Sequence, residues 1–327
     1  MKLKLVGHSG QRESLKRLLK DNKLPSTILF AGASGIGKLT VARELSRSLF
    51  CGANPAPYGG CGECEMCRLF EVGNVADFHL IECSDKSNLG VDGIKDVLYT
   101  LNLKSYHGGA RVIVLNDADA LLTQSANALL KSLEEPRPNT WYILVTANPS
   151  RLPQTIISRS QVWFFNTLSH AEVLEVLKLK DNADLPPNLS LEDLAILSDG
   201  SPGNCTEIAR YFGEWVTCKE TLSAIFSGDI KVATQFAATL AKDKDSLRGK
   251  LRLLRIYART RMLESPPHVK WATCLTNIIT AERLIFDRNL AAGTVLLAVF
   301  LNLVSDDHLN SFTTLTNSVT LLKDMVV

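Results

Sequence analysis

The chain has 327 residues, of which 46% are hydrophobic, 21% are charged and 7% are aromatic. This composition excludes a disordered or fibrous protein, and the length predicts two or three domains. Lys and Arg total 36 against 34 Asp and Glu, which gives a net charge of +2. Any contact with nucleic acid must therefore be local.

The two most relevant segments for targeting are the N-terminus and an apolar run near the other end. The segment from Met1 to His8 lacks the apolar stretch of a secretory signal. Residues 290–304 are interrupted by Gly293 and Asn302 and fall short of the roughly 20 residues that a membrane span needs. We expect a cytoplasmic protein in which residues 290–304 form a buried helix.

The first half of the chain alternates between helical and strand patterns. Residues 11–24 have a helical pattern, and a glycine-rich loop then separates a buried strand at 27–31 from a helix at 38–50. A later helix stops at Pro136. Further strands are predicted at 78–82, 111–115, 141–146 and 162–165. The alternation predicts an α/β fold with a parallel sheet.

Helical patterns replace the strand signal from Ser169 onward. A break at Asp199-Gly-Ser-Pro-Gly203 separates a small helical unit from a last helical stretch of about 110 residues, which is long enough for a domain of its own. We predict an α/β domain over residues 1–167 with a cysteine-rich insertion at 51–67, a small helical unit over 168–212 and a helical domain over 213–327.

The glycine-rich loop reads Gly32-Ala-Ser-Gly35-Ile-Gly37-Lys38 and joins a predicted strand to a predicted helix. In this context a P-loop offers backbone N–H groups and a helix N-terminus to phosphates, while its lysine reaches the terminal phosphates. We predict that these glycines and Lys38 form a nucleotide-binding loop. The alternative is a chance glycine turn.

The positions that should hold the metal ion are altered. A Ser or Thr hydroxyl normally follows the P-loop lysine and binds Mg²⁺, but Leu39 has no oxygen to offer. Thr40 comes one residue later, where the helix has turned the side chain by about 100°. The third predicted strand ends in Asn116 and Asp117 instead of an Asp and a Glu, which weakens metal binding and water activation. We predict a loop that can hold ATP and hydrolyses it poorly or not at all.

Four of the eight cysteines, Cys51, Cys61, Cys64 and Cys67, follow the pattern C-x9-C-x2-C-x2-C. Four thiolates suit one tetrahedral zinc ion and close its coordination sphere, so we predict a structural Zn²⁺ site. Reduced core thiols, disulfides and an iron–sulfur cluster are the alternatives. A cytosolic setting disfavours disulfides, and the ferredoxin-type motif lacks a cysteine three residues beyond Cys67.

Two further motifs complete a resemblance to a known family. They are Asn127-Ala-Leu-Leu-Lys-Ser-Leu-Glu-Glu-Pro136 and Thr155-Ile-Ile-Ser-Arg159-Ser160. With the loop and the cysteine insertion, they make essentially the whole chain similar to the AAA+ subunits of the bacterial clamp loader. The resemblance implies a P-loop AAA+ sheet domain with a zinc insertion, a helical lid over residues 168–212 and an all-α collar domain that serves oligomerisation.

The resemblance also implies roles for single residues. Arg159 matches the arginine finger that such subunits supply to the ATP bound by the next subunit, and the alternative is a surface arginine or an internal salt bridge. Thr146 matches the first sensor, although a plain strand-end threonine fits equally well. The second sensor is usually an arginine just after Gly-Ser, whereas this chain has Pro202-Gly-Asn204 there and no cation.

Within this family, the altered metal positions favour a subunit of the delta-prime type over a gamma/tau motor. Such a subunit joins gamma/tau and delta subunits in a hetero-oligomer that loads the sliding clamp on primed DNA. The resemblance implies structural Zn²⁺ and an ATP site with doubtful Mg²⁺ binding. The alternatives are an autonomous gamma/tau-like ATPase in which Thr40, Asp117 and Asp119 hold the metal, and a zinc-dependent scaffold in which Arg159 is inert.

The last helical domain carries four arginines at helical spacing, Arg248, Arg252, Arg255 and Arg259, opposite a row of apolar residues. A basic stripe of this kind is typical of a solvated helix face. We predict a solvated face in preference to a phosphate-binding one.

Overall fold

A computed structural model describes residues 5–83, 109–179, 185–186, 189–264 and 269–304. The chain forms two compact units. Unit 1 contains residues 1–182 and 200–204, and unit 2 contains residues 183–199 and 205–327. The finer division into three parts at residues 167 and 212 stays a prediction.

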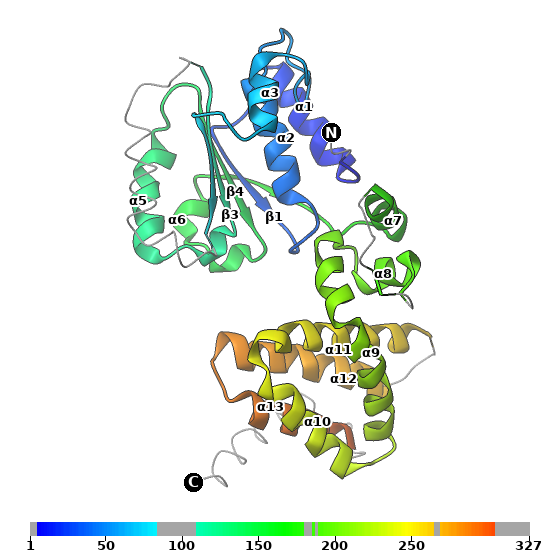
Figure 1. The fold of residues 1–327 in the computed structure, drawn as a ribbon. Helices are drawn as coiled ribbons and strands as arrows, with labels where there is room; N and C mark the ends of the chain where they lie inside the picture. Colours follow the sequence, from blue (N-terminus) through cyan, green and yellow to red (C-terminus); the bar gives the residue numbers. More distant parts are fainter. Residues whose placement is uncertain (1–4, 84–108, 180–184, 187–188, 265–268, 305–327) are drawn as a thin grey trace. The chain divides into compact units, whose positions relative to one another are not determined.

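A five-stranded parallel sheet with the order β2-β3-β4-β1-β5 forms the centre of unit 1 (Figure 1). The strands are β1 (Thr27–Ala31), β2 (Phe78–Glu82), β3 (Arg111–Asn116), β4 (Thr140–Thr146) and β5 (Gln161–Phe164). The inner strands β1, β3 and β4 are almost entirely buried, as expected for a parallel sheet with helices on both faces. All five predicted strands are confirmed, with ends that differ by one residue at most.

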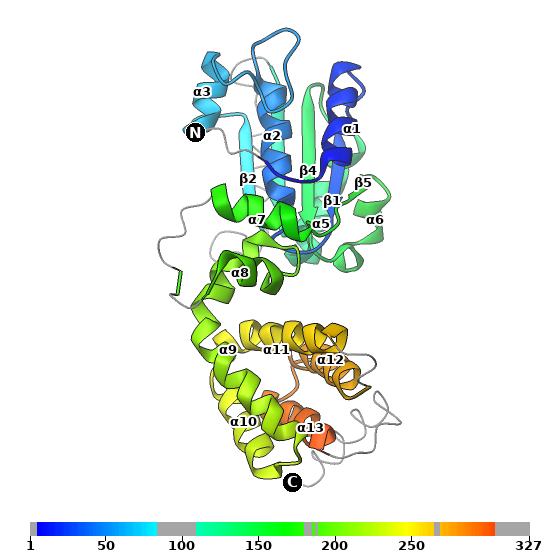
Figure 2. The ribbon, with the colours of Figure 1, turned by 90° about the vertical axis from the view of Figure 1, so that its right-hand side faces the viewer.

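Helices cover both faces of the sheet (Figures 1 and 2). In the described residues of unit 1 the helices are α1 (Ser9–Lys20), α2 (Lys38–Phe50), α3 (Glu65–Glu71), α5 (Thr123–Glu134), α6 (Gln154–Ile157) and α7 (His170–Leu179), with the short 3₁₀ helices η1 (Ala118–Ala120), η2 (Pro149–Arg151) and η3 (Pro202–Asn204). Alternate residues of β1 face opposite sides: Phe30 packs with Leu45 of α2, and Leu29 packs with Leu129 of α5. The predicted α/β architecture is confirmed.

The first helix is shorter than its sequence pattern predicts. It ends at Lys20 instead of Leu24, because Asn22 adopts the left-handed conformation with φ 52°. The Lys23 N–H donates to the Leu18 carbonyl oxygen at 2.9 Å, which satisfies one of the last carbonyls of the helix.

Within its described residues, unit 2 contains only helices. They are α8 (Leu191–Leu197), α9 (Cys205–Phe226), α10 (Ile230–Lys242), α11 (Lys244–Glu264), α12 (Val269–Glu282), the π-helix η4 (Arg283–Asp287) and α13 (Ala292–Val304). Their apolar faces form one core that includes Leu222, Leu251 and Phe300. Helix α13 lies in this core, which confirms the buried helix predicted near residues 290–304. In the part of the chain that the structure describes, no helix is long and apolar enough to cross a membrane.

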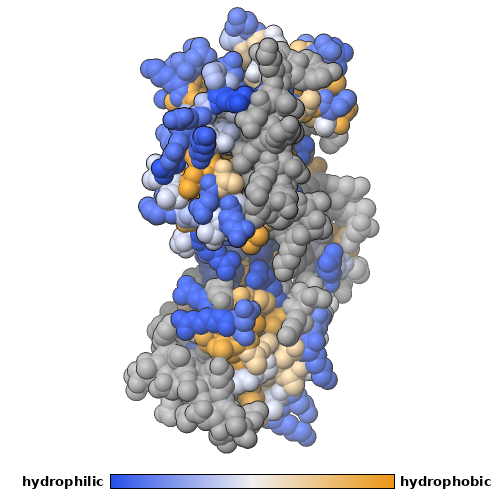
Figure 3. All heavy atoms as spheres, turned by 90° about the vertical axis from the view of Figure 1, so that its left-hand side faces the viewer, coloured by the Kyte–Doolittle hydropathy of each residue, from blue (hydrophilic) through white to orange (hydrophobic). Residues whose placement is uncertain are grey.

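The basic stripe on α11 is tied to its own unit. Arg255 donates to Glu282 Oε2 at 3.1 Å, and Arg259 pairs with Asp199. The guanidinium of Arg248 lies over the Phe286 ring, 4.4 Å from its centroid. The prediction of a simply solvated face is therefore incomplete, because these arginines have partners on α12, on η4 and in the turn after α8. On the side that Figure 3 presents, hydrophobic residues also gather on the surface of unit 2.

Candidate functional site

The glycine-rich loop of unit 1 connects the end of β1 to the start of α2, as predicted. Gly37 is the residue before α2 and has φ 101°, a conformation that side chains other than glycine rarely adopt. The helix N-terminus therefore opens directly from the loop. This arrangement is the one in which backbone N–H groups can receive a phosphate.

The P-loop lysine is folded back onto its own loop. Lys38 Nζ donates hydrogen bonds to the carbonyl oxygens of Gly32 and Ala33 at 2.7 and 2.6 Å. The residue is buried, and burial lowers the pKa of Lys38 to about 8 even though Asp117 and Asp119 act in the opposite direction. A triphosphate that entered the loop would have to replace both hydrogen bonds.

The carboxyl ends of β2 and β3 bring an unpredicted carboxylate to the site. Glu82 and Asn116 face each other in the parallel register, and Asn116 Nδ2 donates to Glu82 Oε2 at 2.6 Å. The sequence pattern indicates a lost carboxylate at Asn116 and does not predict that Glu82 lies at the site. The signal that could have found it is the alignment of the two strand ends, since residues at the carboxyl ends of neighbouring parallel strands lie side by side.

Two aspartates, Asp117 and Asp119, follow β3, and the carboxylate of Asp119 accepts hydrogen bonds from the end of β4 and the residue after it. Asp117 immediately precedes η1 and adopts the left-handed conformation with φ 52°. Asp119 Oδ1 accepts from Thr146 Oγ1 at 2.6 Å and from the Ala147 N–H at 3.2 Å. Thr146 is fully buried at the end of β4. The hydroxyl that resembles a first sensor is therefore hydrogen-bonded to Asp119.

The position that follows Lys38 is occupied by Leu39, whose apolar side chain has no oxygen to offer a metal ion. Leu39 packs against the apolar cluster between the sheet and helices α1 to α3, so this position cannot contribute a metal ligand. Thr40 is half-buried one residue later. The metal-binding role considered for Thr40, Asp117 and Asp119 stays a prediction.

Two segments from elsewhere in unit 1 contact the loop. The Gly203 N–H donates to the Gly35 carbonyl oxygen at 2.8 Å, and a Cβ atom at Gly203 would lie 2.6 Å from Gly35 Cα. From the N-terminal side, His8 Nε2 lies 2.8 Å from the Ile36 carbonyl oxygen. Asn204, in the region that resembles the second sensor, is buried beside Gly35. Among the described residues, the loop is therefore contacted by a backbone N–H group and by the side chains of His8 and Asn204, and not by an arginine of the kind expected at a second sensor.

Arg159 follows α6 and has a partly exposed side chain. Its Nε donates to Glu134 Oε1 at 2.8 Å, and its Nη2 contacts the same oxygen. Nη1 donates to the Thr155 carbonyl oxygen at 2.9 Å and lies 3.4 Å from Ser158 Oγ. The internal salt bridge, one of the alternatives for Arg159, is therefore present.

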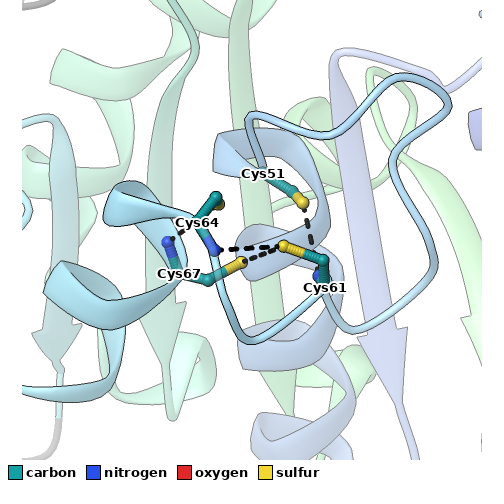
Figure 4. A group of neighbouring side chains, drawn as sticks. All are labelled: Cys51, Cys61, Cys64 and Cys67. Atoms are coloured by element: carbon teal, nitrogen blue, oxygen red, sulfur yellow. Dashed lines mark hydrogen bonds between the residues drawn. The ribbon is translucent and has the colours of Figure 1, made fainter.

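The four predicted metal ligands come together at one point (Figure 4). Cys51 follows α2, Cys61 lies in the loop, and Cys64 and Cys67 lie at the start of α3. All four Sγ atoms are within 4.8 Å of one another, and Cys61 Sγ lies 4.0 Å from Cys67 Sγ. Zn–S bonds of about 2.3 Å in a tetrahedron separate the sulfurs by about 3.8 Å. The cluster therefore fits a single zinc ion.

Backbone N–H groups around the cluster favour thiolates. The groups with N···S distances of 3.3 to 3.5 Å belong to Gly52, Cys61, Glu63, Cys64 and Cys67. Two of them, from Glu63 and Cys64, lower the pKa of Cys61 to about 6. In contrast, burial raises the pKa of Cys67 to about 11. A bound metal ion would replace the proton of Cys67 and would offset the unfavourable free energy of forming a buried thiolate there.

Arg47 from the last turn of α2 lies beside the cysteine cluster. A Cβ atom at Gly60 would contact both Cys67 Sγ, at 2.7 Å, and Arg47 Cγ, at 2.9 Å. Arg47 Nη2 is 3.6 Å from Glu71 Oε2 on α3. A cation near a tetrathiolate site offsets its negative charge. The helix that starts at the glycine-rich loop therefore ends at the cysteine cluster.

Comparison with known proteins shows which family the chain resembles. The family model described as "DNA polymerase III, delta subunit" matches residues 7–169. Through these residues, which make up just under half of the chain, the chain is similar to the DNA polymerase III delta-subunit family. The match confirms the resemblance to clamp loader subunits, and its range covers the loop, the cysteine cluster and Arg159.

Curated proteins similar to this chain include both types of clamp loader subunit. The chain is 35% identical over 196 residues to the delta-prime subunit of DNA polymerase III from Escherichia coli, which covers 60% of the chain and 57% of the relative. It is 37% identical over 177 residues to the Pseudomonas aeruginosa delta-prime subunit, with 53% and 52% covered. It is 35% identical over 175 residues to the tau/gamma subunit from Haemophilus influenzae, with 53% and 25% covered. The matched regions thus span between a quarter and 57% of these relatives.

Solved structures also resemble this chain at low identity. A DNA polymerase III gamma subunit-related protein from Thermotoga maritima has a TM-score of 0.42 and 17% identity, and the match covers 96% of this chain and 99% of that one. A RuvB variant from Thermotoga maritima has a TM-score of 0.45 and 14% identity, with 89% and 85% covered.

Proposed function

We propose that this chain is a delta-prime-type subunit of the DNA polymerase III clamp loader. In this role it joins gamma/tau and delta subunits in a cytoplasmic complex that places the sliding clamp on primed DNA. It hydrolyses little or no ATP itself and presents Arg159 to the ATP site of the adjacent subunit. The family match and the delta-prime relatives support the assignment to the complex.

The observation that carries this proposal is the state of the chain's own nucleotide loop. Lys38 is hydrogen-bonded to loop carbonyl oxygens, and Leu39 offers no oxygen to Mg²⁺. Hydrolysis of a nucleoside triphosphate requires both phosphate and metal contacts. Arg159, in contrast, lies on a partly exposed turn and carries a guanidinium that can neutralise charge on a phosphate from outside.

A gamma/tau-like motor is the second candidate. The tau/gamma relatives at 30–35% identity favour it, as does the carboxylate of Glu82 beside Asn116. Its distinguishing property is ATP turnover by the isolated chain. Turnover at the rate of an ordinary ATPase would establish the motor and contradict our proposal.

For the cysteine cluster we propose one structural zinc ion, held by Cys51, Cys61, Cys64 and Cys67. The spacing of the sulfurs and the N–H···S hydrogen bonds support this assignment. Zinc would join the end of α2 to the start of α3 and takes no part in chemistry, because four thiolates leave no open coordination position.

The test of the trans-acting role is the change Arg159→Ala in the reconstituted complex. We expect ATP turnover at the contacted site to fall by on the order of 10³-fold, because an arginine finger supplies charge neutralisation in the transition state. Steady-state ATP hydrolysis in the presence of clamp and primed DNA measures this loss. Assembly, measured by gel filtration, should be unchanged.

The matched control is Arg151→Ala. Arg151 is also exposed and lies eight positions earlier in the sequence, so the change removes the same charge from another exposed position of unit 1. Full turnover with Arg159→Ala, or an equal loss with Arg151→Ala, would exclude a specific role for Arg159.

A further inference from the structure

The contact between Arg159 and Glu134 joins two helices of unit 1. Glu134 is the last residue of α5, and Arg159 lies two residues after α6. The two helices pack side by side (Figure 1). Two nitrogens of the guanidinium, Nε and Nη2, converge on one carboxylate oxygen, Glu134 Oε1. This edge of the guanidinium is therefore fixed by its own chain.

The remaining hydrogen bonds leave part of the guanidinium available. Arginine has five N–H donors. Two contact Glu134, one donates to the Thr155 carbonyl oxygen, and one lies at a longer 3.4 Å from Ser158 Oγ. At least one N–H, on Nη2, is not accounted for by these contacts. Arg159 can thus contact an external phosphate while Glu134 still holds it.

Stability of the fold does not explain the contact well. The side chains of Arg159 and Glu134 are 33% and 48% exposed, and ion pairs with this exposure add little to stability. The contact instead restricts the side chain of Arg159, which would otherwise sample many rotamers. A restricted rotamer is valuable where a group must meet a reacting atom in one geometry.

We propose that Glu134 is a positioning residue that holds Arg159 in the orientation needed to contact the phosphate of a neighbouring subunit. This inference rests on the trans-acting role of Arg159 proposed above. Glu134 touches no substrate and acts only through Arg159. It keeps the Nε edge of the guanidinium on α5 and leaves the outer end for the phosphate.

The experiment compares Glu134→Gln with Glu135→Gln in the reconstituted complex. Glu135 is the next residue, is exposed and follows the end of α5, whereas the carboxylate that accepts from Arg159 is that of Glu134. The two changes remove the same charge from adjacent positions. ATP turnover is measured as kcat and KM with clamp and primed DNA, at a concentration of the chain that saturates assembly.

We expect Glu134→Gln to lower kcat at the contacted site by about tenfold with KM unchanged, since a misplaced group costs up to about 10²-fold. Glu135→Gln should match the unmodified complex. In a chain that already carries Arg159→Ala, Glu134→Gln should have no further effect, because both changes remove the same interaction.

Each contrary result has a separate meaning. If Arg159→Ala leaves turnover intact, the trans-acting role itself is wrong. If Arg159→Ala lowers turnover and Glu134→Gln does not, only the positioning role is wrong. A rise in turnover with Glu134→Gln, or an additional loss in the Arg159→Ala chain, would also overturn it, because Glu134 would then restrain the arginine or act elsewhere.

Discussion

At the scale of single residues, Lys38 shows how the chain satisfies a charged group without a ligand. Its ammonium is buried and donates to two carbonyl oxygens of its own loop. Burial nevertheless disfavours the charged form, which is why the pKa of Lys38 is lowered from 10.5 to about 8. The loop therefore holds a charge that costs stability at neutral pH.

This cost predicts a pH dependence of stability. The pKa of Lys38 is lower in the folded chain than in the unfolded chain, so between pH 8 and 10.5 the unfolded chain binds more protons at this site. Stability from this group then rises with pH across that window. By pH 9.5 we expect a gain of up to about 2 kcal/mol relative to pH 7. Urea unfolding measured against pH, compared with Lys38→Met, isolates this contribution.

In Lys38→Met the group is absent, so the extra rise in stability above pH 8 should disappear. Equal pH slopes for the two proteins would mean that Lys38 titrates at its ordinary pKa in the folded state. The effects of tyrosines and cysteines on the slope cancel in this comparison, since both proteins contain them.

The residues of the site were partly predictable. The P-loop, the cluster of four cysteines and the altered Leu39 could be recognised because each follows from a short local spacing. Glu82 beside Asn116 could not be recognised in this way, because the two residues are 34 positions apart and meet only through the strand order. For the same reason the partner of Arg159 was not foreseen, although Glu134 belongs to one of the motifs noted in the sequence.

At the scale of elements, the contact between the loop and η3 depends on two glycines. The Gly203 N–H donates to the Gly35 carbonyl oxygen, and the two backbones approach so closely that a Cβ atom at Gly203 would lie 2.6 Å from Gly35 Cα. Since both partners are backbone atoms, neither can move aside cheaply.

Gly203→Ala is therefore expected to destabilise the fold by about 1–3 kcal/mol, as overpacking does. Thermal unfolding measures the change. The matched control is Gly213→Ala on α9, where a Cβ atom would meet nothing within 4 Å and where alanine should add about 0.5–1 kcal/mol as a better helix former. A Gly203→Ala protein as stable as the parent would show that the loop and η3 separate easily.

The elements themselves were largely predictable. The five strands follow from apolar runs in a sheet that is covered on both faces. The end of α1 did not follow from periodicity, because a single left-handed residue, Asn22, stops the helix inside an otherwise helical pattern. The arginine pattern on α11 predicted the helix correctly but not its contacts, since Glu282 and Asp199 come from distant parts of the sequence.

At the scale of the whole molecule, the two units have separate hydrophobic cores. The core of unit 2 contains residues from α9 to α13, whereas the two clusters of unit 1 lie on the faces of the sheet. A change confined to the cysteine cluster should consequently lower the local stability of unit 1 and leave that of the core of unit 2 unchanged.

The change Cys64→Ser tests both the metal and this separation. We expect the purified chain to contain one zinc ion and Cys64→Ser to lose it, because three thiolates bind the ion far less tightly than four. Hydrogen exchange should increase around residues 51–71 and stay unchanged in α10 and α13. Metal analysis and hydrogen-exchange mass spectrometry provide the two readouts.

Cys83→Ser is the control, since Cys83 is buried outside the cluster and its loss should leave the zinc content at one. Iron in place of zinc in the parent chain, or full zinc in Cys64→Ser, would contradict the proposed site. Increased exchange in α10 or α13 would show that the two cores are coupled.

The hydrogen bonds of Lys38 to its own loop also bear on how tightly the loop can bind a nucleotide. A ligand gains only the difference between its contacts with this ammonium and the two carbonyl contacts that it displaces. In a loop of this kind the lysine adds less to affinity than it would if its ammonium were free in the empty state.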